Sequence, residues 1–179
     1  MIWEQYWSLA YFLISVFSPF SPYGPQLDVP VTSVTSGGWR ECFKKAYRDS
    51  LDSNIVTSIM ESYCKGSDIM LACRKENFAS IQLLAWAPRS CVFTNTTGTS
   101  GSVTTNCQGT EWYFSKSYSW GFAAGGDTVS KSSCDKASSG SPNKRLCFHT
   151  DGSTGYRCGN TGSSSSYELL IFQRGDEMI

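Results

Sequence analysis

The sequence is poor in charge, holds a single histidine and has no closely spaced pair of cysteines. Charged residues make up 17% of the 179-residue chain, and Lys+Arg and Asp+Glu are equal at 15 each. A chain with no net charge and no basic run longer than Lys44-Lys45 has no field that would gather nucleic acid, so no nucleic-acid partner is expected. One histidine and no C-x-x-C pair leave Cys/His zinc sites without ligands. The residues therefore predict no metal and no cofactor.

Catalytic motifs are also missing. Nucleophilic hydrolysis needs a base beside the nucleophile, and the only histidine is His149, with Asp151 two residues further on. No G-x-S-x-G elbow accompanies it, and a histidine in this apolar stretch is more simply a strand residue at the edge of a core. The acidic residues are scattered singly, without the facing pair of a glycosidase, and phosphate and calcium loops are absent. We expect a protein that is not an enzyme.

What the chain does have is eight cysteines, 16 glycines and an aromatic share of 14%. Many aromatic residues on a Gly/Ser/Thr-rich background are typical of short strands and tight turns in extracellular β domains. An even number of cysteines without metal spacing indicates disulfides, which persist in oxidising compartments; the alternative is eight buried, reduced thiols in a cytosolic protein. The sequence predicts a β-rich fold, mainly antiparallel with one or two short α-helices and held by disulfides, in a secreted or cell-surface protein.

The N-terminal part divides into an apolar run and a Pro-rich segment. The run over residues 6–17 has signal-peptide length and is too short to span a bilayer as a helix, so no integral membrane span is expected. Glu4 stands where a signal peptide prefers positive charge, and no clear cleavage site follows, so a cleaved leader, an anchor and a misassigned start all stay open. We expect a leader or anchor-like segment over 1–17, a Pro/Ser/Thr/Gly-rich linker over 18–37, one disulfide-rich domain over 38–174 and a tail over 175–179.

Two tripeptides carry a possible surface function. Asn95-Thr96-Thr97 is an acceptor sequence for N-glycosylation, so Asn95 is a predicted glycosylation site in an exported protein. Arg174-Gly175-Asp176 matches an integrin-recognition motif of adhesion proteins, just past the last predicted strand. Three-residue matches are frequent by chance, and a flexible tail is not the constrained loop that favours tight binding.

One helix and seven strands are expected in the domain. The helix opens at Ser53; Ile55, Ile59 and Tyr63 share one of its faces, and Gly66 is its expected end. The strand candidates are separated by Gly, Ser, Asn and Asp, as strand connections require. They cover residues 69–74, 80–87, 91–94, 112–122, 145–150, 156–158 and 167–173.

The two halves of the domain show a similar order of cysteines. Ile59-x-x-Ser62-x-Cys64 with a following Leu71-x-Cys73 resembles Val129-x-x-Ser132-x-Cys134 with a following Leu146-Cys147. An internal pseudo-repeat and coincidence are both open. A repeat would make Cys64–Cys73 and Cys134–Cys147 equivalent bridges, with Cys91–Cys107 clipping one loop and Cys42–Cys158 tying the start of the domain to its end. Spacing alone leaves many other pairings possible.

The densest aromatic segment runs from Glu111 to Phe122. On a single strand, the even positions from Trp112 to Phe122 share one face and Tyr113 opposes them. This face is either the core of the domain or a surface on which flat rings stack against a sugar. The residues expected at such a ligand surface are Trp39, Trp86, Trp112, Tyr113, Tyr118, Trp120 and Tyr156.

A series of short motifs resembles a module of uncharacterised, predicted secreted proteins that has no established name. The motifs are LACR (71–74), APR (87–89), WYF (112–114), SWGFA (119–123), GD (126–127), RLCFHT (145–150) and GYRCG (155–159). The resemblance implies export and a domain of similar limits, and it implies no activity and no site residues. Cys91 and Cys107 depart from the module's pattern, which suits a bridge particular to this chain.

Three functions are compatible with these features. We expect an extracellular, non-enzymatic recognition module with carbohydrate as its ligand class, and with glycans or other surface or matrix proteins as partners. The alternative is a structural or adhesive surface protein that self-associates or binds matrix. The third hypothesis is a secreted hydrolase that uses His149.

Overall fold

Two antiparallel β-sheets form the folded part of the chain, which a computed structural model describes over residues 23–96, 103–134, 140–150, 156–162 and 164–175. The first sheet has five strands: β1 (Gln26–Pro30), β2 (Arg40–Ala46), β3 (Asp68–Lys75), β4 (Ser80–Pro88) and β11 (Tyr167–Arg174). The second has six: β5 (Thr105–Cys107), β6 (Thr110–Tyr113), β7 (Ser119–Ala124), β8 (Leu146–His149), β9 (Arg157–Cys158) and β10 (Thr161–Gly162). Their spatial orders are β1-β4-β3-β11-β2 and β10-β9-β8-β7-β6-β5. The predicted mainly antiparallel β fold is confirmed.

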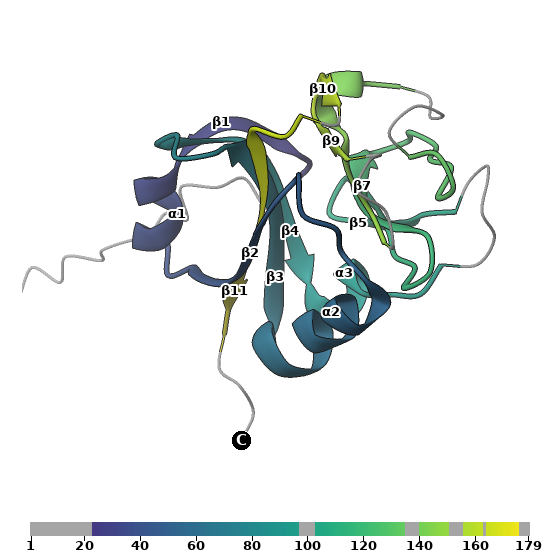
Figure 1. Ribbon diagram of the computed structural model, residues 1–179, viewed down its shortest axis with the longest axis horizontal. Helices are drawn as coiled ribbons and strands as arrows, with labels where there is room; N and C mark the ends of the chain where they lie inside the picture. The colour runs from purple at the N-terminus through teal and green to yellow at the C-terminus, as the bar shows by residue number, and fades with distance from the viewer. Residues whose placement is uncertain (1–22, 97–102, 135–139, 151–155, 163, 176–179) are drawn as a thin grey trace, which may run out of the picture.

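The helical segments in the described residues are few and short, as predicted. They are α1 (Val31–Ser36), α2 (Ser53–Ser58), the π-helical η1 (Ile59–Tyr63), α3 (Arg89–Val92) and the 3-10 turn η2 (Pro142–Lys144). In Figure 1, α1 lies on one side of the five-stranded sheet and the six-stranded sheet lies on the other, while α2 and α3 lie at one end. The five-stranded sheet is therefore the middle layer of the molecule.

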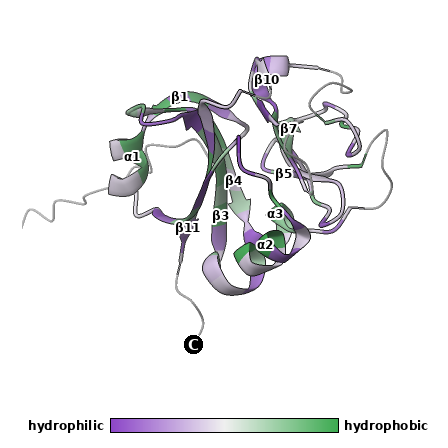
Figure 2. Ribbon diagram, in the orientation of Figure 1, coloured by the Kyte–Doolittle hydropathy of each residue, from purple (hydrophilic) through white to green (hydrophobic). Residues whose placement is uncertain are grey.

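This middle layer is buried on both faces. Successive residues of a strand point to opposite faces, so Ile69 and Leu71 of β3 meet the six-stranded sheet while Met70 meets the layer of α1. Five consecutive residues of β3 and six of β11 are buried. Figure 2 shows the resulting concentration of hydrophobic residues along β3 and β4. Unbroken apolar runs are the sequence signature of a sheet covered on both sides.

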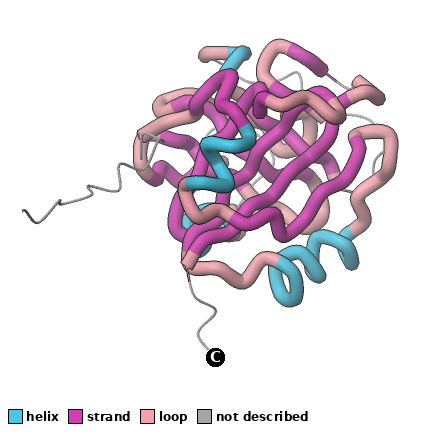
Figure 3. The backbone as a smooth tube through the Cα atoms, turned by 90° about the vertical axis from the view of Figure 1, so that its left-hand side faces the viewer, coloured by secondary structure: helices cyan, strands magenta, loops and turns pink. Residues whose placement is uncertain are grey.

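Part of the segment predicted as a linker belongs to the domain. β1 pairs with β4, and α1 places the fully buried Val34 against the outer face of the five-stranded sheet beside Trp39 and Phe172. In Figure 3, α1 lies across the strands of this sheet. The predicted domain start near residue 38 is therefore too late, because the apolar outer face needs the cover that residues 26–36 supply. The predicted leader over 1–17 lies outside the described residues.

Two local predictions need correction. The helix begins at Ser53 as expected, with Asp52 as its cap: Asp52 Oδ1 accepts from the Ile55 N–H at 2.7 Å. It continues as η1, which ends at Tyr63 before the expected stop. The predicted strand over 91–94 is wrong, since Arg89–Val92 form α3; a four-residue apolar run has no period that separates helix from strand. The edge strands β1, β2, β5 and β10 have no counterpart among the predicted strands.

The predicted strand over 112–122 is two strands joined by a turn. The Ser115 N–H donates to the Ser119 carbonyl at 3.0 Å, so the chain reverses between β6 and β7. Trp112 pairs directly with Phe122 across the two strands. The predicted faces are right for the residues within the strands: Trp112 and Phe122 enter the core between the sheets, and Tyr113 points to the opposite face. They are wrong for Tyr118, which lies exposed in the turn.

Four disulfides connect all eight cysteines. The pairs are Cys42–Cys64, Cys73–Cys158, Cys91–Cys107 and Cys134–Cys147. The last two agree with the predicted map, but the predicted Cys42–Cys158 and Cys64–Cys73 bridges are wrong. Cys73 lies on the inner face of β3, where it meets β9 of the other sheet, and β2 lies next to the end of η1. The two halves therefore lack equivalent bridges, and the disulfides do not support a pseudo-repeat.

Candidate functional site

Most rings predicted to form a ligand surface are buried. Five of the seven are at most 2% exposed: Trp39, Trp112, Tyr113, Trp120 and Tyr156. A ring at that depth cannot stack on a ligand without unfolding part of the domain, so the core interpretation of the aromatic segment holds. Tyr118, in the turn between β6 and β7, is 46% exposed, and Trp86 is partly exposed.

Trp86 is covered by a cation. The guanidinium carbon of Arg174 lies 4.9 Å from the ring centre of Trp86 and 4.6 Å from that of Trp39. Arg174 also donates to the carboxylate of Asp68 at 3.1 Å. The first residue of the predicted integrin motif is therefore fixed within β11 rather than carried on a flexible tail. Asp176 lies outside the described residues.

The structure brings a different set of residues together in a groove of about 300 Å³ beside the edge strand β2. Its lining residues are Phe43, Lys44, Lys45, Asp52, Asn54, Ile55, Ser58 and Tyr63. The half-exposed ring of Tyr63 stacks on Phe43, with ring centres 6.3 Å apart and planes inclined by 15°. This cavity, which we call the β2 groove, combines flat apolar area with hydroxyl, amide, carboxylate and ammonium groups.

Covalent and polar links hold both walls of the β2 groove. The Cys42–Cys64 disulfide joins the residue before Phe43 to the residue after Tyr63. On the helical side, the Arg89 guanidinium donates to the carbonyls of Met60 and, at 3.3 Å, of Cys64. Because these links fix η1 against β2, the groove is preorganised and its occupation requires little ordering of the chain.

A second cavity, of about 340 Å³, also borders η1, through Met60. It is lined by Met60, Phe93, Asn95, Phe114, Ser115, Lys116 and Ser117. The Lys116 ammonium lies 3.6 Å from the Glu61 carboxylate, an ion pair between the β6–β7 turn and η1. The predicted glycosylation site Asn95 is exposed at this cavity, which we call the Asn95 cleft.

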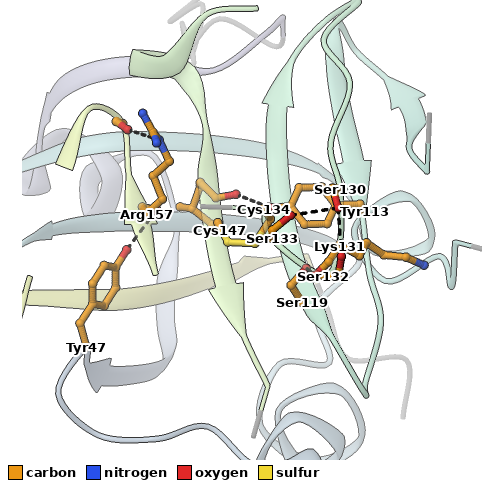
Figure 4. Close-up of a disulfide and its surroundings, with 12 residues drawn as sticks. Tyr47, Tyr113, Ser119, Ser130, Lys131, Ser132, Ser133, Cys134, Cys147 and Arg157 are labelled. Atoms are coloured by element: carbon orange, nitrogen blue, oxygen red, sulfur yellow. Dashed lines mark hydrogen bonds between the residues drawn. A yellow bond between two sulfur atoms is a disulfide. The ribbon is translucent and has the colours of Figure 1, made fainter. Parts of the chain in front are cut away.

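His149 lies next to a disulfide. One of its ring nitrogens and the sulfurs of Cys134 and Cys147 all lie within 4.8 Å of one another. Figure 4 shows the two sulfurs bonded to each other, and a bonded sulfur is neither a thiolate nucleophile nor a thiolate metal ligand. Asp151, the carboxylate of the hydrolase hypothesis, lies outside the described residues. The structure thus adds no support to that hypothesis.

Two buried ionisable groups stabilise the loops of the six-stranded sheet. The Lys131 ammonium donates to the carbonyl of Thr96 and, at 3.2 Å, to its hydroxyl, and burial lowers the pKa of this lysine. In Figure 4 its side chain extends away from the Cys134–Cys147 disulfide. Burial alone would raise the pKa of Glu111, but three hydrogen bonds to its carboxylate outweigh burial and lower it. The donors are Gly126 N–H, Asn106 Nδ2 and Thr104 Oγ1.

Sequence reasoning missed the β2 groove because its walls come from segments that are apart in the chain. Tyr63 was expected on the apolar face of a helix, although it is one of the most exposed aromatic residues of the described chain. Cys42 and Phe43 stand between two charged pairs, Arg40-Glu41 and Lys44-Lys45, so the sequence of β2 lacks the alternation that would have indicated a half-exposed strand. No local pattern indicates that Phe43 and Tyr63 stack.

No family model matches this chain, and no curated protein and no solved structure matches it. The resemblance to a secreted module therefore identifies no family, and what holds of it is the Cys-rich, β-rich fold with four disulfides. Within the ranges that the structure describes, no helix is long and apolar enough to cross a membrane.

Proposed function

We propose that this protein is an extracellular, non-enzymatic recognition module that binds a saccharide in the β2 groove. Four disulfides indicate an oxidising environment of the extracellular type, since a reducing cytosol does not maintain them. The observation that carries the proposal is the Phe43–Tyr63 stack in a groove whose remaining lining is largely polar.

The chemistry of the groove matches the two faces of a sugar ring. A pyranose presents a flat set of C–H groups and a rim of hydroxyls, which require an aromatic surface and hydrogen-bonding side chains respectively. Tyr63 supplies the surface. Asn54 and Ser58 stand four residues apart on α2 and both line the groove, so both face the same ligand.

The size of the groove limits the ligand. A volume of about 300 Å³ is at the lower end of the range of small-molecule sites, roughly 300–1,000 Å³. It suits a terminal sugar or a short glycan end rather than the length of a polysaccharide chain. Lys44 and Lys45 beside Asp52 leave the groove with a positive excess, which favours a sugar that bears a carboxylate or sulfate.

The test is a glycan array followed by calorimetric titration of the best ligand. Tyr63→Ala should lower affinity about tenfold or more, which corresponds to about 1.4 kcal/mol or more of lost stacking. Tyr118→Ala is the matched control, because Tyr118 is another tyrosine of similar exposure, 46% against 51%, and does not line the groove. Loss of binding in the Tyr118 variant with none in the Tyr63 variant would contradict the proposed site.

Size-exclusion chromatography of the same sample addresses the structural or adhesive alternative. A monomer that binds a glycan supports the recognition module. A concentration-dependent oligomer that binds none of the arrayed glycans would favour self-association instead.

A further inference from the structure

The Asn95 cleft lies at the side chain of an asparagine that carries the acceptor sequence for N-glycosylation. Asn95 is exposed and lines the cleft, and Thr96 and Thr97 complete the tripeptide in the sequence. The cleft is open beside its own candidate attachment point. Any first sugar on Asn95 is thereby confined to the space near the cleft.

The residue after Asn95 is tied down rather than carried on a free loop. The Thr96 N–H donates to the Phe114 carbonyl at 3.2 Å, and the Thr96 hydroxyl accepts from the Phe114 N–H at 3.4 Å. The buried Lys131 ammonium donates to the Thr96 carbonyl and hydroxyl. On the other side, the Cys91–Cys107 disulfide anchors α3 at Cys91, four residues before Asn95. Asn95 is therefore held at the edge of the cleft.

The walls of the Asn95 cleft divide into an apolar and a polar side. Met60, Phe93 and Phe114 form the apolar side, of which Met60 is half-buried and Phe93 is 8% exposed. Phe114 is buried, and its ring supports that of Phe93 edge to face, with centres 5.5 Å apart. Ser115, Lys116 and Ser117 form the polar side. A pyranose with an N-acetyl group offers the matching pair of surfaces, a C–H face with a methyl group and a rim of hydroxyl and amide groups. A volume of about 340 Å³ suits a single sugar residue at the small end of the range of ligand sites.

We infer that the first N-acetylhexosamine of a glycan linked to Asn95 binds in the Asn95 cleft. In the attachment step, the amide nitrogen of Asn95 loses a proton and bonds to the anomeric carbon of the sugar. The bond between that carbon and a lipid-linked diphosphate donor breaks, and the diphosphate leaves. The inference rests on the proposed extracellular location and is independent of the β2 groove.

The seated sugar covers the part of the apolar side that is open to water, which is the half-buried Met60 and the small exposed part of Phe93. The expected result is a rise in thermal stability that comes from the first sugar alone and not from the rest of the glycan. For a domain of this size the rise should be about 2–4 °C, the shift expected when the exposed part of the apolar side is covered. The N-acetyl methyl protons should also resonate upfield, since the ring of Phe93 lines the cleft beside them.

The experiment uses the full chain, secreted from eukaryotic cells behind a cleavable signal peptide, so that its own N-terminal segment does not decide the outcome. Mass spectrometry of the tryptic peptide measures occupancy of Asn95. One part of the sample is trimmed by an endoglycosidase that leaves a single sugar, and another is stripped by an amidase. The trimmed protein should have the same melting temperature as the untreated protein, and the stripped protein should melt about 2–4 °C lower.

Two variants serve as controls. Ser117→Tyr fills the cleft from an exposed position, and it should leave occupancy unchanged while removing the difference between trimmed and stripped protein. Asn95→Gln with Ala79→Thr moves the acceptor to Asn77, an exposed position in the β3–β4 turn outside the cleft. A single sugar on Asn77 should leave the melting temperature unchanged.

Three results would overturn the inference: an unoccupied Asn95 in the secreted protein, equal melting of trimmed and stripped protein, or an N-acetyl methyl resonance at its position in a free glycan. None of them bears on saccharide binding in the β2 groove, which the Tyr63 and Tyr118 variants test on unglycosylated protein. If no glycan of the array binds but the sugar on Asn95 stabilises the protein, saccharide binding in the β2 groove is rejected and the inference about Asn95 stands.

Discussion

The two sheets of this domain are built by different means. Strands of the five-stranded sheet are five to nine residues long, whereas those of the six-stranded sheet are two to six residues long. Long strands that are buried on both faces are stabilised by apolar area. Strands of two or three residues bury too little area and form too few ladder hydrogen bonds to stay in place alone.

Cross-links compensate for this difference. Cys158 on the two-residue β9 is bonded to Cys73 of the long strand β3. Cys107 on the three-residue β5 is bonded to Cys91 of α3, which directly follows β4 of the five-stranded sheet. Cys134–Cys147 secures the loop that follows β7. Short strands persist here because disulfides and the hydrogen bonds to the Glu111 carboxylate replace buried area.

Removal of the Cys73–Cys158 bridge should have the largest effect. It joins the two sheets over 85 residues, so Cys73→Ala with Cys158→Ala should cost about 4.5 kcal/mol in the chain-entropy account. Cys91→Ala with Cys107→Ala, over 16 residues, should cost about 3 kcal/mol. Urea denaturation of both double variants measures the two losses. Equal losses of stability in the two double variants would show that a bridge between the sheets stabilises the domain no more than the shorter Cys91–Cys107 bridge does.

The next effect tests whether the five-stranded sheet has two cores. Leu170 and Ile171 are neighbours on β11 that face α1 and the six-stranded sheet respectively, and both are fully buried. Leu170→Ala and Ile171→Ala should each cost about 3 kcal/mol, because each leaves a cavity in a packed layer. Chemical denaturation gives the values. A loss below about 1 kcal/mol for Leu170→Ala would mean that the outer face is not a true core.

A smaller effect tests whether α1 belongs to the domain. Val34→Ala should lower the free energy of unfolding by about 2 kcal/mol, since Val34 is fully buried against the outer face. Thr32→Ala, at an exposed position of the same helix, should stay within about 0.5 kcal/mol of the unaltered protein. Equal stability of the two variants would show that residues 31–36 are a linker and do not contribute to the core.

The smallest effect concerns Glu111, which stabilises the β5–β6 edge of the six-stranded sheet. Its pKa is lowered in the folded protein, so its contribution is present above its ordinary value of 4.5 and is lost as the pH falls through the folded pKa. Glu111→Gln should cost about 1.5 kcal/mol at pH 7 and flatten the acid limb of the stability curve below about pH 4.5. Melting curves of the unaltered protein and of the Glu111→Gln variant, recorded from about pH 3 to about pH 7, measure this difference. An unchanged acid limb would exclude Glu111 as a source of acid sensitivity.

The candidate site was less predictable than the fold. The sequence left both a core and a ligand platform open for Trp112 and Trp120, because period-two alternation reports which residues share a face and not whether that face meets water. Only the opposing sheet settles this. For Tyr63 the error runs the other way. The helical period predicted it on an apolar face together with Ile59, yet Ile59 is buried and Tyr63 is half exposed at the groove.

By itself, the sequence determined the central strands and the class of the fold. The apolar runs from Ile69 to Cys73 and from Leu169 to Phe172 are long enough to specify strands wherever they pair, and eight cysteines without metal spacing specify disulfides. Tertiary structure alone decided which cysteines meet, that residues 26–36 cover the outer face, and that Phe43 stacks on Tyr63. The reason is physical: alternation and propensity act between neighbours in the chain, whereas a bridge over 85 residues or a groove between β2 and η1 exists only after the layers have packed.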